Sequence, residues 1–227
     1  MQAETPTISE VCTPHDDVLE GSLSENEFAA KLSEVVFNPE TAPDIYADPD
    51  TFFEKTYATD GLQTLLTLLA KRYIGQHKGE FSGEDGLLSL DTVFGGGKTH
   101  SQIAAYHFSK SPESIAKLEK YITDEETRAE FDEVRDELSV QTAVFEGGYV
   151  SATSAKCNKE DDNAPDTQTM WGELAYQLGG AEGYAQFSDY DKEQVAPGES
   201  DVTELFETLD DPGLVLIDEV AQYFEQA

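Results

Sequence analysis

The sequence predicts an α/β protein in which helices cover both faces of a parallel sheet. Short apolar runs bounded by turn signals occur at residues 86–94, 140–147 and 214–217, and each fits a buried strand. Segments with helical spacing of apolar residues separate these runs, and strands that alternate with helices form parallel sheets. We expect a three-layer α/β/α core over residues 81–227, after an N-terminal helical region at residues 1–80.

The N-terminal region carries helix start signals in succession. Ser24 and Glu27 fit a capping box before a first helical stripe of apolar residues. Asp48 and Pro49 fit the cap and the first position of a second helix. Thr59 precedes a third helix, GLQTLLTLLAKRYIG, which we expect to end at its last glycine.

The predicted core continues with helices between the strands. The segment THSQIAAYHF fits a helix, and Ser111 and Asp124 are caps for two more. The segment MWGELAYQLGG fits a helix that a glycine pair stops. In GESDVTELFETL, Asp201 and Glu204 fit a capping box.

The composition is extremely acidic. The 227 residues include 47 Asp and Glu against 14 Lys and Arg, which gives a net charge of −33. The 12 Phe and 10 Tyr are spread along amphipathic stretches, which favours a packed core over disorder. An acidic surface with little lysine is typical of halophilic proteins, because high salt screens the repulsion between like charges.

The composition also excludes several classes. A basic patch is missing, so we expect no direct binding of nucleic acid by this segment. The start, MQAETPTISE, is not a signal peptide, and no apolar run approaches the length of a membrane span. Cys12 and Cys157 fit no zinc or redox spacing. We therefore expect a cytoplasmic protein without membrane contact.

Residues 91–100, DTVFGGGKTH, end like a phosphate-binding loop. The usual pattern is G-x-x-x-x-G-K-S/T, and Thr92 stands where the first glycine belongs. A β-branched residue disfavours positive φ, so we expect Thr92 to stay in the strand. Gly95, Gly96 and Gly97 can then form the bend and approach phosphate oxygens at a helix N-terminus.

The residues after the glycines supply the side chains of such a site. Lys98 fits the contact with the β- and γ-phosphates, and Thr99 fits a hydroxyl ligand of Mg²⁺. His100 is placed beside the nucleotide, although a packing role is also open. The alternative for the whole stretch is a flexible glycine turn followed by a chance Lys-Thr pair.

The second half of the predicted site is LVLIDE, residues 214–219. Ligands of open α/β sheets bind at the carboxyl ends of the strands, where Asp218 is expected. Asp218 suits the Mg²⁺ side of phosphoryl transfer, and Glu219 suits polarisation of the attacking water. The two motifs together predict a phosphate-loop NTPase, and the absence of a guanine-reading motif favours ATP with Mg²⁺. The alternative is a buried strand followed by an ordinary helix start.

The chain resembles large prokaryotic AAA-like phosphate-loop ATPases that carry a domain of unknown function and are encoded near DNA methyltransferase and defence genes. The resemblance implies ATP binding through residues 95–99, hydrolysis by Asp218 and Glu219, partner proteins in DNA modification or defence, and an oligomer when complete. A missing first glycine is usual in that family. The resemblance covers nearly the whole chain and rests on VCTPHDDVLEG, DPDTFFEKTYATDGLQTLL, TVFGGGKTHSQIAAYHF, TMWGELAYQLGG, APG and LVLIDEVAQYF.

The resemblance also implies an incomplete core. In this class a further strand, later in sequence, lies between the phosphate-loop strand and the strand with the magnesium acid. We therefore expect an N-terminal fragment that lacks an arginine finger and turns over ATP weakly. The strands at 87–93 and 214–217 should then belong to one sheet without being hydrogen-bonded neighbours, which would favour association.

Two other functions stay open, a nucleotide-sensing scaffold and a fragment without catalysis.

Three further features of the sequence resemble binding motifs but are weaker signals than the two halves of the ATP site. Cys12 and His15 form half a zinc motif, and KEDDNAPD lacks the glycine and final glutamate of a calcium loop. Trp171 fits a core position better than a base-stacking platform.

Overall fold

The computed structural model describes residues 13, 19, 21, 30–79, 86–90, 97–118, 122, 124–151, 154–157 and 163–226. By packing, the chain divides into two units, residues 1–30 and 31–227. The second unit contains the described helices of the expected N-terminal helical region together with the sheet. The elements described below all belong to this second unit.

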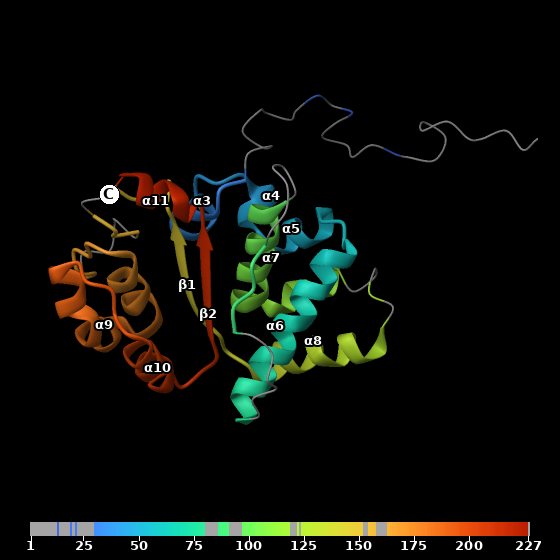
Figure 1. Ribbon diagram of the computed structural model, residues 1–227. Helices are drawn as coiled ribbons and strands as arrows, with labels where there is room; N and C mark the ends of the chain where they lie inside the picture. Colours follow the sequence, from blue (N-terminus) through green and yellow to red (C-terminus); the bar gives the residue numbers. More distant parts are fainter. Residues whose placement is uncertain are drawn as a thin grey trace, which may run out of the picture. The chain divides into compact units, whose positions relative to one another are not determined.

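A two-stranded parallel sheet lies in the middle of the unit (Figure 1). Strand β1 spans Gln141–Glu146 and strand β2 spans Gly213–Asp218, with Gln141 opposite Gly213 and Glu146 opposite Asp218. Both strands were expected from their apolar runs. Since parallel strands run in the same direction, their carboxyl ends meet at one edge of the sheet, and each ends in an acid.

One face of the sheet is covered by α9 (Met170–Glu193) and α10 (Glu199–Glu207). Ala143 of β1 and Val215 of β2 belong to the apolar cluster of this face. The cluster draws its other members from both helices and the loop after α10: Trp171, Leu174, Ala175, Leu178, Phe187, Leu205, Phe206 and Leu209.

The other face is covered by α7 (Lys98–Lys110), which contacts both strands. Around α7 lie α5 (Pro49–Lys55), α6 (Asp60–Lys78), the 3-10 helix η2 (Pro112–Lys117) and α8 (Glu125–Glu137). The remaining helices are α3 (Leu32–Phe37), α4 (Asp44–Ala47) and α11 (Val220–Gln226). Helices therefore lie on both faces of the described strands (Figure 1).

Helix α9 bends back on itself at Gly180, whose φ of 60° and ψ of −147° are not helical. The glycine stop was expected here, but the second helical half was not. The halves pack closely, because a Cβ at Gly183 would lie 2.4 Å from the carbonyl oxygen of Ala175. Asp191, fully buried near the end of the second half, accepts hydrogen bonds from the N–H and hydroxyl of Thr169, which caps the first half.

Several helix starts follow the local capping rules. The Asp48 carboxylate accepts the N–H of Thr51 at 2.8 Å, and the Thr59 hydroxyl accepts the N–H of Leu62 at 3.2 Å. Asp124 caps α8 in the same way. The expected capping box at Ser24 lies outside the described residues.

Other boundaries differ from the expected ones. Helix α6 continues past Gly75 to Lys78 and ends at Gly79, which adopts a left-handed φ of 67°. The segment after Ser111 is a 3-10 helix instead of an α-helix. Helix α10 begins one turn before the expected box, because Asp201 accepts the N–H of Gly198 at 2.8 Å.

The expected strand at 86–94 is not seen in its described part. Residues 86–90 are neither helix nor strand, and Leu87 is 83% exposed. A strand needs a neighbour for its backbone hydrogen bonds, and no described strand pairs with these residues. Among the described residues, β2 pairs with β1 alone, and residues 91–94 lie outside the described part.

Candidate functional site

The candidate site begins at the N-terminus of α7. Gly97 takes a left-handed φ of 77°, and its carbonyl oxygen accepts the N–H of Ser101 at 2.9 Å. The positive φ is the conformation for which a glycine is needed at this position. Gly95 and Gly96 lie outside the described residues, so a hollow formed by the glycine loop stays a prediction.

Thr99 and Asp218 meet at the carboxyl end of β2. The Thr99 hydroxyl donates a hydrogen bond of 2.8 Å to Oδ2 of Asp218, and Oδ1 accepts the N–H of Glu219 at 3.0 Å. Asp218 is only 8% exposed, so these donors replace water around a carboxylate inside the protein. The structure thus joins the two motifs that the sequence placed in one site.

A second contact ties α7 to the same end of β2. The Gln102 side chain donates from Nε2 to the carbonyl oxygen of Ile217 at 3.2 Å. Gln102 lies one turn after Thr99, so both contacts come from one face of the helix. Lys98, in the first turn of α7, lines a groove together with Asp218.

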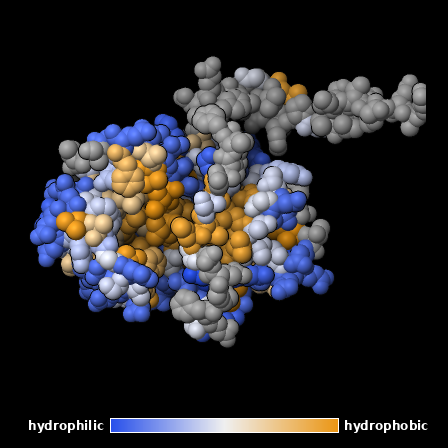
Figure 2. Space-filling view, in the orientation of Figure 1, coloured by the Kyte–Doolittle hydropathy of each residue, from blue (hydrophilic) through white to orange (hydrophobic). Residues whose placement is uncertain are grey.

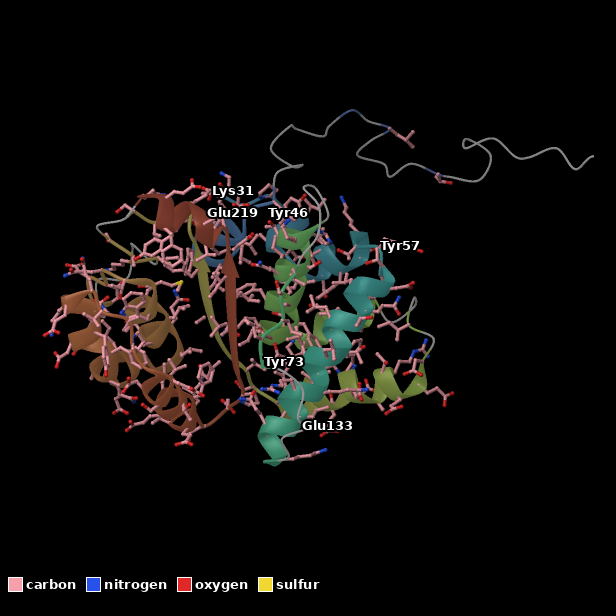
Figure 3. The ribbon with its side chains drawn as sticks, in the orientation of Figure 1. Lys31, Tyr46, Tyr57, Tyr73, Glu133 and Glu219 are labelled. Atoms are coloured by element: carbon pink, nitrogen blue, oxygen red, sulfur yellow. The ribbon has the colours of Figure 1, made fainter. Side chains whose placement is uncertain are left out.

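Glu219 follows β2 in a backbone conformation that is rare for its residue type. Its φ is 48°, and such conformations persist where the surroundings fix them. A Cβ at Gly147 would lie 2.2 Å from the Glu219 carbonyl oxygen, so only glycine fits beside it. The Glu219 carboxylate accepts a hydrogen bond of 3.0 Å from Gln222, and Figure 3 shows Glu219 beyond the end of β2.

His100 does not lie with Thr99 and Asp218, although the sequence placed it beside the nucleotide. Its Nε2 is 3.0 Å from the Thr56 hydroxyl, and its ring lies 4.6 Å from that of Phe52. Burial lowers the pKa of His100, which favours the neutral ring. His100 therefore packs toward α5, in agreement with the packing role that the sequence left open for it.

The sequence prediction missed Glu146, the acid at the carboxyl end of β1. Glu146 stands opposite Asp218 in the sheet, and its Oε2 accepts the N–H of Ser33 at 2.8 Å. The carboxylate thus satisfies a free N–H in the first turn of α3. The signal was present, since residues 143–146, AVFE, are an apolar run ending in an acid, as residues 214–218, LVLID, are.

The described residues contain no cluster of three or more His, Cys, Asp or Glu that could hold a metal ion. Mg²⁺ keeps several waters and takes few protein ligands when phosphates supply the rest. Thr99 and Asp218 fit that limited role. The weaker sequence features add no residue to the site. Trp171 packs against the apolar cluster of α9, while Cys12 and His15 lie outside the described residues.

These features describe a largely helical protein with a two-stranded parallel sheet and a polar site where a glycine-capped helix meets the acidic end of a strand. The chain belongs to the DUF499 family, because the model of the DUF499 N-terminal domain matches residues 10–227. No curated protein and no solved structure matches the chain. None of the helices in the described ranges is long and apolar enough to cross a membrane.

Proposed function

We propose that the chain binds ATP with Mg²⁺ where α7 meets the end of β2, and that the full-length protein hydrolyses it. The observation that carries the proposal is the hydrogen bond of 2.8 Å between Thr99 and Asp218. It places a hydroxyl at a helix N-terminus beside a carboxylate at a strand end. These are the two protein groups that hold Mg²⁺ in phosphate-loop NTPases.

Each residue has a chemical role in this proposal. The N-terminus of α7 points backbone N–H groups at the phosphates, and Lys98 neutralises the outer ones. Thr99 contributes its hydroxyl to Mg²⁺, and Asp218 contributes a carboxylate, directly or through water. Glu219 accepts a proton from the attacking water. In this proposal, the backbone N–H groups of Gly95 and Gly96 complete the concave site that binds the phosphates.

The resemblance to AAA-like ATPases supports a wider context. We propose that ATP turnover drives or switches a process in DNA modification or defence, with partner proteins and an oligomeric state of the complete protein. The match to the DUF499 N-terminal domain agrees only with the part of that resemblance that concerns a domain of unknown function.

A second candidate is a scaffold that binds ATP without turning it over. The hydrogen bond from Gln222 to the Glu219 carboxylate favours it, because this contact engages one oxygen of the group that would polarise water. Binding and turnover must therefore be measured separately.

Titration calorimetry in molar KCl with Mg²⁺ tests the proposal. ATP should bind the parent protein and bind Lys98→Ala much more weakly, because the phosphates lose their cation. Lys117→Ala removes one positive charge from η2, away from the site, and should bind ATP as the parent does. Equal affinities of the parent and Lys98→Ala would overturn the assignment.

A further inference from the structure

Glu219, which accepts the water proton in the proposed function, has a backbone conformation that needs an explanation. In the described part of the chain, only Glu219 and Gln194 combine a side chain with a positive φ. Gln194 ends helix α9, where a left-handed residue is common. Glu219 instead lies between the end of β2 and the start of α11. Its φ of 48° therefore points to neighbours that hold the backbone in place.

The closest such neighbour is Gly147, the residue that follows β1. A Cβ at Gly147 would lie 2.2 Å from the carbonyl oxygen of Glu219 and 3.0 Å from the nitrogen of Tyr223. The N–H of Gly147 also donates to the Asp218 carbonyl oxygen at 3.0 Å, so it holds the peptide group before Glu219. Because these neighbours are main-chain atoms, they cannot swing aside as the end of a side chain would.

Helix α11 fixes one side of this close approach. The carbonyl oxygen of Glu219 accepts the N–H of Gln222 at 2.9 Å, at the start of the helix. Tyr223 of the helix is buried, and its ring lies edge-on against that of Phe145 in β1, with 5.2 Å between the centroids. The start of α11 therefore cannot turn away from Gly147 without losing these contacts.

Helix α3 and the residues after it fix the other side. The carboxylate of Glu146 accepts the N–H of Ser33 at 2.8 Å, and the hydroxyl of Tyr149 accepts a hydrogen bond of 3.2 Å from Asn38. Glu146 and Tyr149 flank Gly147 in the chain, so the segment is tied down before and after the glycine. A side chain at Gly147 would therefore displace the start of α11 rather than the end of β1.

Strand β1 has more support than β2. On its outer side, the N–H of Val144 donates to Oε1 of Gln177 at 2.7 Å, and Nε2 of Gln177 donates to the Val144 carbonyl oxygen at 3.0 Å. This amide caps the outer edge of β1 in place of a neighbouring backbone. Among the described residues, β2 pairs with β1 alone, and hydrophobic residues gather over β2 and the adjoining part of α6 (Figure 2). The end of β2 is therefore positioned from β1.

We propose that Gly147 is a positioning residue, which holds Glu219 in its left-handed conformation and so directs the carboxylate toward the water that attacks ATP. This inference rests on the proposed function, in which Glu219 takes the proton of that water. A general base must lie within hydrogen-bond reach of the proton that it accepts, and a shift of about 1 Å can lower a rate by about 100-fold. The missing side chain of Gly147 lets β1 support the backbone of the base directly.

Gly147→Ala in the full-length protein tests the effect on the reaction. Turnover of saturating Mg²⁺-ATP should fall by about tenfold or more, because Glu219 is displaced from the attacking water. The calorimetric affinity for Mg²⁺-ATP should stay close to that of the parent, since Lys98, Thr99 and Asp218 keep their contacts. Loss of binding together with turnover would mean that Gly147 supports the fold as a whole, and would overturn the proposal. Unchanged turnover would overturn it as well.

Gly148→Ala is the matched control, one residue further along the chain. A Cβ at Gly148 would meet the side-chain amide of Gln222, with Oε1 at 2.7 Å. Gln222 is exposed, so this amide can move away. Gly148→Ala should therefore not lower turnover. A loss equal to that of Gly147→Ala would contradict a specific role of Gly147.

Urea unfolding of two variants at Glu219 tests the backbone conformation without ATP. Glu219→Gly and Glu219→Ala both remove the carboxylate, but only glycine takes a φ of 48° without strain. The urea midpoint of Glu219→Gly should therefore be the higher one, although glycine ordinarily lowers stability relative to alanine. An equal or higher midpoint for Glu219→Ala would overturn the proposal. Absence of ATP binding by the parent would overturn the proposed function instead, so the two failures are distinguishable.

Discussion

The hydroxyl of Thr99 and the carboxylate of Asp218 are hydrogen-bonded across 119 residues of chain. Thr99 belongs to the first turn of α7, and Asp218 ends β2. The contact brings the hydroxyl and the carboxylate next to each other. In the proposed site, groups that the fold already holds together lower the cost of binding Mg²⁺.

Thr99→Val should lower the affinity for ATP in Mg²⁺ but leave the affinity for ATP in EDTA nearly unchanged. The valine keeps the shape of the side chain but removes the oxygen that Mg²⁺ would take. Ser101→Ala is the matched control, because the Ser101 hydroxyl donates to the Gly97 carbonyl oxygen of its own helix. An equal loss in EDTA would mean that Thr99 acts on the fold of the loop instead of on the metal.

Glu219→Gln should lower ATP turnover of the full-length protein by about 100-fold or more, while Mg²⁺-ATP still binds. The amide cannot accept the proton of the attacking water. Glu225→Gln changes an exposed acid on α11 and should leave turnover unchanged. Turnover of Glu219→Gln at the parent rate would remove Glu219 from the mechanism.

Asp191→Ala should lower the free energy of unfolding by about 3 kcal/mol, because buried donors lose their acceptor. The fully buried carboxylate accepts hydrogen bonds from the N–H groups of Gln168 and Thr169 and from the Tyr184 hydroxyl. Asp189→Ala removes an exposed acid of the same helix and should change stability by less than about 0.5 kcal/mol. Urea unfolding measures the free energy of unfolding of both variants. Similar losses of stability in Asp191→Ala and Asp189→Ala would refute the role of Asp191.

Stability should fall as the pH drops below about 6.5, the ordinary pKa of histidine in the unfolded chain. Burial lowers the pKa of His100 and of His107, so below this pH the unfolded chain takes up protons that the folded chain refuses. The double variant His100→Gln, His107→Gln should show a flatter stability curve between about pH 7 and 5. His77→Gln, at the exposed end of α6, is the control. Parallel curves for parent and double variant would contradict the prediction.

Local rules account for the parts of the fold that the sequence predicted. An apolar run followed by an acid predicted β2, and the caps Asp48 and Thr59 each act on a residue three positions away. The second half of α9 was missed because Gly180 breaks the helical pattern of the sequence. What holds this half in place is a contact far apart in the chain, since Asp191 accepts the N–H of Thr169 in front of the first half.

The candidate site also combines residues that short motifs predicted with contacts that depend on long-range packing. Lys98, Thr99 and Asp218 were predicted because their residue types carry the chemistry in short motifs. Two hydrogen bonds of the site were not predicted, from Gln102 to Ile217 and from Gln222 to Glu219. They depend on how α7 and α11 pack, which the local spacing of residues does not reveal. The contact of His100 with Phe52 likewise depends on how α7 packs, since the helix turns the ring toward that side chain.

The edge cap on β1 gives the last prediction. Gln177→Leu removes both hydrogen bonds to Val144 and the donor to Glu173, so the free energy of unfolding should fall by about 2 kcal/mol. The bare edge should also promote association in molar KCl, where charge repulsion is screened. Gln186→Leu makes the same exchange at an exposed position of α9 and should leave stability and oligomeric state unchanged. Light scattering and urea unfolding measure both effects. If Gln177→Leu keeps the oligomeric state of the parent and is as stable as Gln186→Leu, the amide does not protect the edge.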